Sequence, residues 1–360
     1  MSLQFIFGGS GRGKTYYMQH YITEEAKRFP DRQYIFLVPE QFTMQTQKEL
    51  IQMSEAKGIL NIDVQSFLRL AFRVFSETGA NNLPVLDDMG KTMILKKVLN
   101  NLEDQLAYFG GNIHKKGYVQ EIKSFLSELL QYGADEETIE EMIQACSKHT
   151  VLAKKLTDMK IIYTGFKEYL SQHFITSEEV MTVLADVTSE SAILQNSVVC
   201  LDGFTGFTPT QYAFIRQLLS AAKKVYISVA MDKRESVVKV GAKHTLFYMS
   251  QHTISRLRSI AKEQGVEVCE EIWTGETPEE TRFEKAPGIL TLEQNLFRYP
   301  VCSYEGVPTD ISIHVLKQPE KEVAFAAEQI RELLVKENCR YRDIAVVTGN
   351  LEVYGMLASE

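Results

Sequence analysis

The stretch that decides the fold lies near the start of the chain and reads Gly8-Gly9-Ser10-Gly11-Arg12-Gly13-Lys14-Thr15. It satisfies the spacing G-x-x-x-x-G-K-[ST] of a phosphate-binding P-loop. Glycines allow backbone angles with positive φ, so that successive amide N–H groups can face one anion. Lys14 would reach the β- and γ-phosphates, and the hydroxyl of Thr15 would hold Mg²⁺. The motif therefore predicts that residues 8–15 bind ATP and Mg²⁺.

The residues on either side of the motif have the pattern that a P-loop requires. Residues 3–7 form an apolar run typical of a buried strand, and residues 15–29 have helical spacing, with Tyr17, Tyr21 and Ala26 on one side. The N-terminus of such a helix directs free N–H groups and the positive end of its dipole at a bound phosphate. A chance match is the alternative, and the strand–loop–helix context argues against it.

Strand and helix patterns alternate along the parts of the chain that flank a long helical region. Short apolar runs rich in β-branched and aromatic residues are typical of buried parallel strands. The pattern predicts strands at residues 34–38, 62–64, 197–201 and 224–229, and helices at residues 66–75 and 246–264. This alternation predicts an α/β fold with a parallel sheet covered by helices.

Residues 87–184 show only helical periodicity, so an all-helical subdomain is predicted to be inserted into the α/β domain. A new α/β unit is expected near the end, with a strand at 311–316, a helix at 320–336 and a strand at 343–347. Such a fragment cannot bury both faces of its sheet, which gives the chain the look of a truncated protein. The predicted domains are residues 1–84 and 191–285 for the P-loop domain, 85–190 for the helical insertion, and 286–360 for the start of a second domain.

A P-loop needs a carboxylate at the end of another strand to hold the bound magnesium ion. Residues 198–201 are apolar and are followed by Asp202, which is the best candidate for this ligand. A role for Asp202 as a turn or helix cap is the alternative. Hydrolytic motors usually place a Glu next, where it orients the attacking water, whereas this chain has Gly203. Slow or absent hydrolysis is expected, and no catalytic residue is assigned.

The composition limits the class of protein. The chain has 360 residues, of which 44% are hydrophobic and 24% charged, as expected for a soluble protein with two or three domains. No apolar run approaches the roughly 20 residues needed to cross a bilayer, so no membrane association is expected. The five cysteines are too widely spaced for a zinc site or a disulfide framework, which favours the cytoplasm. With a net charge of −8, any DNA site would need basic residues that line a local groove or charge supplied by another subunit.

Several stretches resemble the AddB family, whose members form the second subunit of the AddAB helicase–nuclease and are built like superfamily 1 helicases. The resemblance covers nearly the whole chain and includes a degenerate second motif in residues 201–211, where Gly203 replaces the Glu of active motors. The stretches that carry it are residues 5–15, 35–41, 64–71, 201–211, 282–283, 292–297, Glu322 and residues 341–347.

The resemblance implies a RecA-like first domain, a helical insertion and the start of a second RecA-like domain. It also implies a role in processing double-strand DNA breaks for recombinational repair, beside an AddA-type motor and nuclease subunit. Family members recognise the Chi signal and end in a nuclease domain with an iron–sulfur cluster. The ligands of that cluster would lie beyond residue 360, so none of the five cysteines is expected to bind iron. Helicase activity is not expected, because of Gly203 and because residues 348–350 lack the arginine that related motors often carry.

In related motors, loops after the sheet strands contact single-stranded DNA through its backbone and by aromatic stacking. The DNA-contacting residues predicted by position are Gln41, Ser66, Phe67, Arg69, Phe204, Phe207 and Gln211. Phe67 also lies on the apolar face of its predicted helix, where a place in the core is the stronger alternative. Phe204 and Phe207 lie in a loop that is too short to bury both.

Four functions remain open from the sequence. The first is an ATP-binding, helicase-like subunit that uses the nucleotide mainly as a conformational or assembly switch. The others are an active ATP-driven DNA translocase, a P-loop phosphotransferase, and a DNA-binding scaffold with an empty P-loop. A phosphotransferase is disfavoured, because the helical insertion and the second α/β unit exceed what such enzymes need and no basic lid segment is present.

Overall fold

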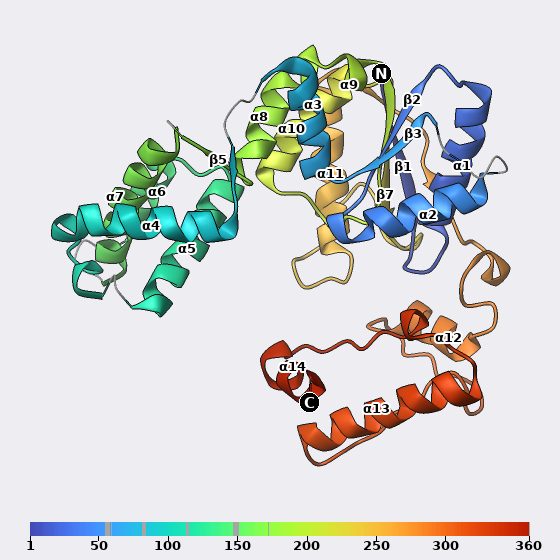
Figure 1. Cartoon of the computed structure of the whole chain (residues 1–360). Helices are drawn as coiled ribbons and strands as arrows, with labels where there is room; N and C mark the ends of the chain where they lie inside the picture. The colour runs from blue at the N-terminus through green and yellow to red at the C-terminus, as the bar shows by residue number, and fades with distance from the viewer. Residues whose placement is uncertain are drawn as a thin grey trace. The chain divides into compact units, whose positions relative to one another are not determined.

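In the computed structural model, the chain divides into two units, Met1–Glu284 and Lys285–Glu360 (Figure 1). The structure describes residues 1–54, 58, 60–80, 84–112, 115–146, 151–171 and 173–359. No helix among these residues is long and apolar enough to cross a membrane.

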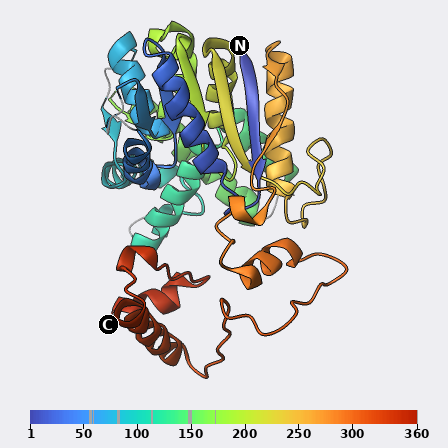
Figure 2. The same ribbon diagram turned by 90° about the vertical axis from the view of Figure 1, so that its right-hand side faces the viewer.

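A parallel sheet forms the centre of the first unit. Its strands are β1 (Ser2–Gly8), β2 (Gln33–Leu37), β3 (Ile62–Gln65), β6 (Ser197–Leu201), β7 (Lys224–Ala230), β8 (Glu267–Val268) and β9 (Ile272–Trp273). The order is β3-β2-β6-β7-β1-β8, with β9 also paired to β1, and every pairing is parallel. Figure 2 shows β1 and β7 side by side. The predicted α/β class and its five longer strands are confirmed, whereas the short strands β8 and β9 were not predicted.

The sheet is buried on both faces, as its continuous apolar strands require. Successive side chains of β1 point to opposite faces, so Phe5 and Phe7 belong to one core and Ile6 to the other. All three are fully buried, and each such side chain contributes about 1.5–3 kcal/mol through the hydrophobic effect. The P-loop therefore follows a strand that is held firmly at the centre of the sheet.

Helices cover the two faces of the sheet. The core with Ile6 is closed by α1 (Lys14–Arg28) and α2 (Thr43–Met53), through residues such as Met18 and Leu50. The helices that close the other core are α3 (Phe67–Thr78), α8 (Glu179–Val187), α9 (Ala192–Gln195), α10 (Pro209–Ala221) and α11 (Tyr248–Glu263). Helix α2 was not predicted, because its residues carry few apolar side chains.

The middle of the chain forms a helical subdomain with its own core. Its helices are α4 (Asp88–Leu102), α5 (Lys116–Gln131), α6 (Glu136–Ala145) and α7 (Val151–Ser171). Two short strands, β4 (Val85–Leu86) and β5 (Ile175–Thr176), pair in parallel where the chain enters and leaves this subdomain. The expectation of helices alone over 87–184 is therefore wrong at β5. Helix α8, also inside the predicted insertion, packs instead against α3 and α10 beside the sheet.

The second unit contains α12 (Pro287–Asn295), α13 (Pro319–Lys336) and α14 (Leu351–Ser359). The helix predicted at 320–336 is confirmed, but the strands predicted at 311–316 and 343–347 are absent, since these residues join no sheet. Apolar side chains within them, such as Val315 and Val347, are each 92% exposed. A strand needs a paired neighbour to satisfy its backbone N–H and C=O groups, and this unit provides none in its described residues.

Candidate nucleotide site

The carboxyl ends of the parallel strands lie at one edge of the sheet, which is where open α/β proteins bind their ligands. The P-loop follows β1, and Asp202 follows β6, with β7 between these two strands. Residues 39–42 follow β2, and Ser66 follows β3. Sequence positions that lie far apart are thus brought to one edge of one sheet.

The P-loop has the backbone conformation that its glycines were predicted to provide. Gly11 and Gly13 have φ of +75° and +76°, and Gly13 is the N-cap of α1. A Cβ atom on Gly8 would lie 2.6 Å from Oγ1 of Thr274, and one on Gly11 would lie 2.8 Å from Cζ of Phe283. Gly11 is therefore required by both backbone conformation and close packing, Gly8 by close packing and Gly13 by backbone conformation.

Lys14 folds back over the loop. Its Nζ donates hydrogen bonds to the carbonyl oxygens of Gly8 and Gly9, at 2.9 and 2.8 Å. This places the ammonium group above the loop and next to the N-terminus of α1, where helix N–H groups also favour an anion. Lys14 and Thr15 both line a hollow of about 520 Å³, here called the phosphate hollow. Its volume lies within the range of about 300–1,000 Å³ that is common for small-ligand pockets.

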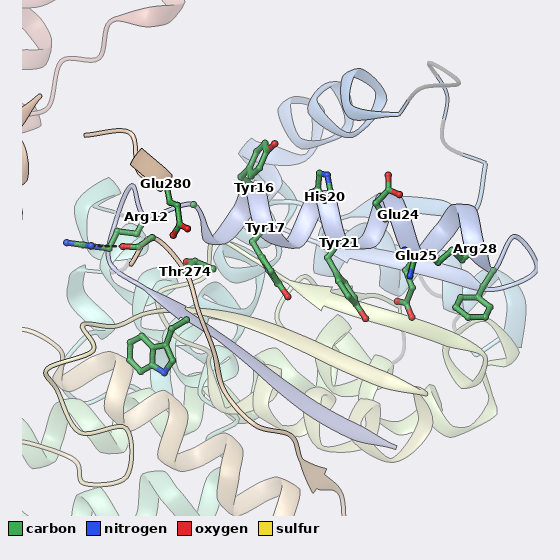
Figure 3. Close-up of a pocket in the computed structure, with 14 residues that line it drawn as sticks. Arg12, Tyr16, Tyr17, His20, Tyr21, Glu24, Glu25, Arg28, Thr274 and Glu280 are labelled. Carbon is green, nitrogen blue, oxygen red and sulfur yellow. Dashed lines mark hydrogen bonds between the residues drawn. The ribbon is translucent and has the colours of Figure 1, made fainter. Parts of the chain in front are cut away.

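A second hollow of about 760 Å³ runs along α1 and is here called the tyrosine groove (Figure 3). Tyr17 and Tyr21 line it, with ring centroids 6.2 Å apart and nearly parallel planes. The hydroxyl of Tyr226 donates to the hydroxyl of Tyr21 at 2.9 Å, and burial raises the pKa of Tyr226 far above its ordinary value. The side of α1 that carries Tyr17 and Tyr21 therefore borders a groove as well as the core.

The two hollows share residues of the P-loop and of a distant segment. Gly13, Tyr16 and Glu280 line both of them. The phosphate hollow borders the loop on the side of Lys14, and the tyrosine groove offers aromatic rings on the side of Trp273. An anionic group beside Lys14 and a flat ring beside Tyr16 could therefore be parts of one ligand.

The predicted magnesium ligands lie in different surroundings. Thr15 is exposed in the phosphate hollow, whereas Asp202 is 4% exposed and accepts a hydrogen bond from the hydroxyl of Ser228 on β7. No group of three or more His, Cys, Asp or Glu residues in the described part of the chain could hold a metal ion. Magnesium is usually bound by one or two carboxylates together with substrate phosphates and water. The residues present fit an ion that arrives with a nucleotide.

Gly203 has φ of +77°, a left-handed conformation that L residues adopt at a cost. The residue after Asp202 is glycine for a backbone reason, and no carboxylate follows Asp202 in this loop. A glycine thus suits the backbone conformation of this loop.

Three of the predicted DNA-contacting residues lie together after β2 and β3. Gln41 is exposed within a 3₁₀ turn, Glu40–Phe42. Arg69 is exposed on α3 and forms an ion pair with Glu40, with 3.1 Å between Nε and Oε1. Ser66 is 4% exposed, and its hydroxyl accepts from the amide of Arg69 as the N-cap of α3. Gln41 and Arg69 are therefore accessible, while the Ser66 side chain supports the helix.

The remaining predicted DNA contacts belong to an aromatic cluster. Phe67 is 8% exposed and lies in the core, with its ring centroid 5.1 Å from that of Phe204 and 6.4 Å from that of Phe207. Phe204 and Phe207 are half-buried, so one part of each ring remains accessible. The side chain of Gln211 accepts from the amide of Thr208 in a capping box at the start of α10. The core position of Phe67 agrees with its apolar helix face, and DNA contact by these residues stays a prediction.

Residues 274–283, here called the strap, cross the P-loop, which no sequence pattern had indicated. The amide of Thr274 donates to the carbonyl of Phe7 at 2.9 Å, and Nη1 of Arg12 donates to the carbonyl of Gly275 at 2.7 Å. The amide of Arg282 donates to the carbonyl of Gly11 at 3.1 Å. These contacts join residues that lie at opposite ends of the first unit's sequence, so no local pattern could have revealed them.

Comparison with known proteins identifies the family. A family model described as "ADDB, N-terminal" matches residues 5–293. A protein from Lachnoclostridium phytofermentans, named as the B subunit of an ATP-dependent helicase/deoxyribonuclease, is 42% identical over 357 residues, which cover 99% of this chain and 31% of that protein. Proteins of the same name from Clostridium novyi and Bacillus anthracis are each 31% identical over 98% of this chain, and 31% and 30% of their own lengths are covered. This chain thus spans less than a third of the length of these relatives, and it belongs to the AddB N-terminal family.

Proposed function

We propose that this chain is the ATP- and Mg²⁺-binding, helicase-like part of the B subunit of a helicase and exodeoxyribonuclease complex. The complex would process double-strand DNA breaks for recombinational repair in the cytoplasm, with an AddA-type motor subunit as the partner of this chain. The relatives are named as the B subunit of an ATP-dependent helicase/deoxyribonuclease, and this name supports the role. A nuclease domain and its iron–sulfur cluster would lie outside residues 1–360.

The conformation of the P-loop is the observation that carries nucleotide binding. Two left-handed glycines shape the loop, Lys14 lies over it, and the phosphate hollow opens beside it. A phosphate bound in this hollow would accept hydrogen bonds from the ammonium group of Lys14, which now donates to the carbonyls of Gly8 and Gly9. Thr15 would bind the magnesium ion together with the phosphate oxygens, and Asp202 would act through the ion's water shell.

We further propose that the nucleotide acts mainly as a switch and is turned over slowly or not at all. The left-handed Gly203 leaves no carboxylate next to Asp202 to orient an attacking water. Binding and release of the nucleotide would then control conformation or assembly with the partner subunit. An active translocase is the competing proposal, which the word helicase in the relatives' name favours.

Equilibrium titration with a fluorescent ATP analogue and Mg²⁺ tests the nucleotide site. Lys14→Ala should weaken binding by about tenfold or more, because a charge-assisted contact to phosphate is lost. Lys27→Ala is the matched control, since Lys27 lies on the same helix and pairs with Glu24 at its exposed end. Equal affinity of the wild type and Lys14→Ala would discard the site.

We propose that single-stranded DNA docks along the loops that follow β2, β3 and β6. Gln41 and Arg69 present exposed polar groups there, and Phe204 and Phe207 present partly exposed rings on which bases can stack. Fluorescence anisotropy with a labelled oligonucleotide measures this binding. Arg69→Ala should weaken it and lower its dependence on salt, whereas an unchanged affinity would remove this edge as the DNA site.

A further inference from the structure

The strap lies on the P-loop and is held at several points. Thr274 is hydrogen-bonded to Phe7 of β1, and Gly275 and Arg282 are hydrogen-bonded to the P-loop. In addition, Nζ of Lys233 pairs with the carboxylate of Glu276 at 2.5 Å. The amide of Glu276 donates in turn to Oε2 of Glu280 at 3.2 Å. The strap is thus a fastened segment, and its position relative to the P-loop is defined by hydrogen bonds at both of its ends.

Glu280 is the strap residue that lies over the anion site. It lines both the phosphate hollow and the tyrosine groove, and its carbonyl oxygen lies 3.4 Å from where a Cβ of Gly13 would be. Figure 3 shows its side chain directed from the strap toward the N-terminal end of α1. Glu280 therefore lines the same hollow as Lys14 and the first residues of α1, where a cation and the helix dipole favour negative charge.

We propose that the strap is a gate on the nucleotide site and that Glu280 is a specificity-determining residue within it. This inference rests on the proposed nucleotide-binding function. The carboxylate of Glu280 occupies the approach to the phosphate hollow, so a nucleotide enters when the strap moves off the loop. The same carboxylate makes binding depend on the charge of the nucleotide and favours its magnesium complex over the metal-free form.

The charge dependence follows from Coulomb's law. Repulsion between Glu280 and the phosphates grows in proportion to the negative charge of the ligand. Magnesium cancels part of the charge of a nucleoside triphosphate, so the metal-free form is repelled more strongly. Replacing the carboxylate by an amide of the same shape removes the repulsion for both forms, and the metal-free form gains more.

Isothermal titration calorimetry on the full chain tests the role of Glu280, with ATP plus Mg²⁺ and with ATP plus EDTA. For Glu280→Gln, affinity should rise about tenfold for metal-free ATP and about threefold for the magnesium complex. Glu279→Gln is the matched control, because the same charge is removed from the adjacent residue, which lines neither hollow. Its affinities should equal those of the wild type.

The outcomes separate this inference from the function on which it rests. If Glu280→Gln binds both forms as the wild type does, while Lys14→Ala binds less tightly, Glu280 is not a gate residue and the nucleotide site stands. If the wild type and Lys14→Ala bind ATP with equal affinity, both the nucleotide site and the gate are refuted. Equal gains for the two forms of ATP would also overturn the charge selection.

Limited trypsin digestion followed by mass spectrometry tests the movement of the strap. Arg282 is exposed, but its amide is held by Gly11, so cleavage after Arg282 should accelerate severalfold when ATP and Mg²⁺ displace the strap. Cleavage after the exposed Lys239 should not change and serves as the internal control. The Lys14→Ala protein should show no acceleration at either position. An unchanged rate after Arg282 in wild type saturated with nucleotide would refute the gate.

Discussion

Gly11→Ala should destabilise the first unit by about 3 kcal/mol, because the new methyl group would press against the strap. Gly11 has φ of +75°, and a left-handed backbone costs a non-glycine residue about 1–2 kcal/mol. The new Cβ would lie 2.8 Å from Cζ of Phe283 and from Cδ of Arg282, well inside the contact distance of about 3.5–4.0 Å. Phe283 is 8% exposed, so its ring has little room to move, and such overpacking costs about 1–3 kcal/mol.

Gly79→Ala separates the two contributions. Gly79 follows α3 with φ of +69°, and a Cβ there would meet no atom within 4 Å. This substitution should cost only the backbone term of about 1–2 kcal/mol. The difference between the two variants, about 1–2 kcal/mol, then measures the contact between P-loop and strap.

The assay is urea unfolding followed by the fluorescence of Trp273, the single tryptophan of the chain. Trp273 immediately precedes the strap, and its ring centroid lies 5.1 Å from that of Phe7 in β1, so its signal reports on the first unit. If Gly11→Ala costs no more than Gly79→Ala, the strap does not rest on the P-loop. The gate would then lose its structural basis.

Three further predictions concern an ion pair, a buried carboxylate and the residue that follows Asp202. Burial opposes the ionisation of Glu178, but the hydrogen bond and charge of Lys91 outweigh it and hold the pKa of Glu178 below its ordinary value. The stability lost in Lys91→Met at neutral pH should therefore shrink as pH falls below about 4, which acid unfolding curves will show. Asp158 is 1% exposed and accepts hydrogen bonds from three backbone N–H groups, so Asp158→Ala should cost about 4 kcal/mol of stability and open amides 107–109 to hydrogen exchange. Asp135→Ala, at an exposed helix N-cap, should cost only about 1 kcal/mol, and equal costs would contradict the prediction. Gly203→Glu should leave DNA-stimulated phosphate release at background, and a rise in that release would show that a side chain alone was missing.

The first unit could be predicted from the sequence because its signals are local and strong. The run before the P-loop is apolar without interruption, and β1 is buried over nearly its whole length. Helix α3 has a Ser N-cap, an apolar stripe and Gly79 at its end, each of which is visible in the sequence. Consistent local signals of this kind fix the elements, and parallel pairing follows from their alternation.

The strands expected at 311–316 and 343–347 show where such reasoning fails. Their residues have strand propensity, but a strand is stabilised by hydrogen bonds and packing with neighbours that the described residues of the second unit do not supply. Ile313 and Val346 are 87% and 70% exposed, so the apolar pattern is present without anything to cover it. Strand propensity alone is therefore not sufficient, because a strand also needs a neighbouring strand with which to pair.

The sequence indicated only part of the candidate nucleotide site. Residues 8–15 form a contiguous motif whose function follows from its own backbone, whereas the strap reaches the loop from the far end of the first unit's sequence. In the hydrogen bonds of Gly275 and Arg282 to the P-loop, the strap uses only a backbone carbonyl and a backbone amide, which nearly every residue possesses. The residue types of the strap therefore do not indicate these contacts. The two glycines that permit close approach, Gly11 and Gly275, gain that meaning only once the structure pairs them with Phe283 and Arg12.

The proposal that the nucleotide is bound without being cleaved rests on the backbone that follows Asp202. Gly203 has a left-handed φ, so a glutamate in its place would carry a backbone cost of about 1–2 kcal/mol in addition to the change of side chain. A nucleotide that is not cleaved leaves only by dissociation, so occupancy of the site would follow the concentration of nucleotide and not a catalytic cycle. A strap that is displaced by binding would then stay displaced for as long as the nucleotide remains. On the proposed function, such a site suits a subunit that signals its state to a partner motor better than one that drives movement itself.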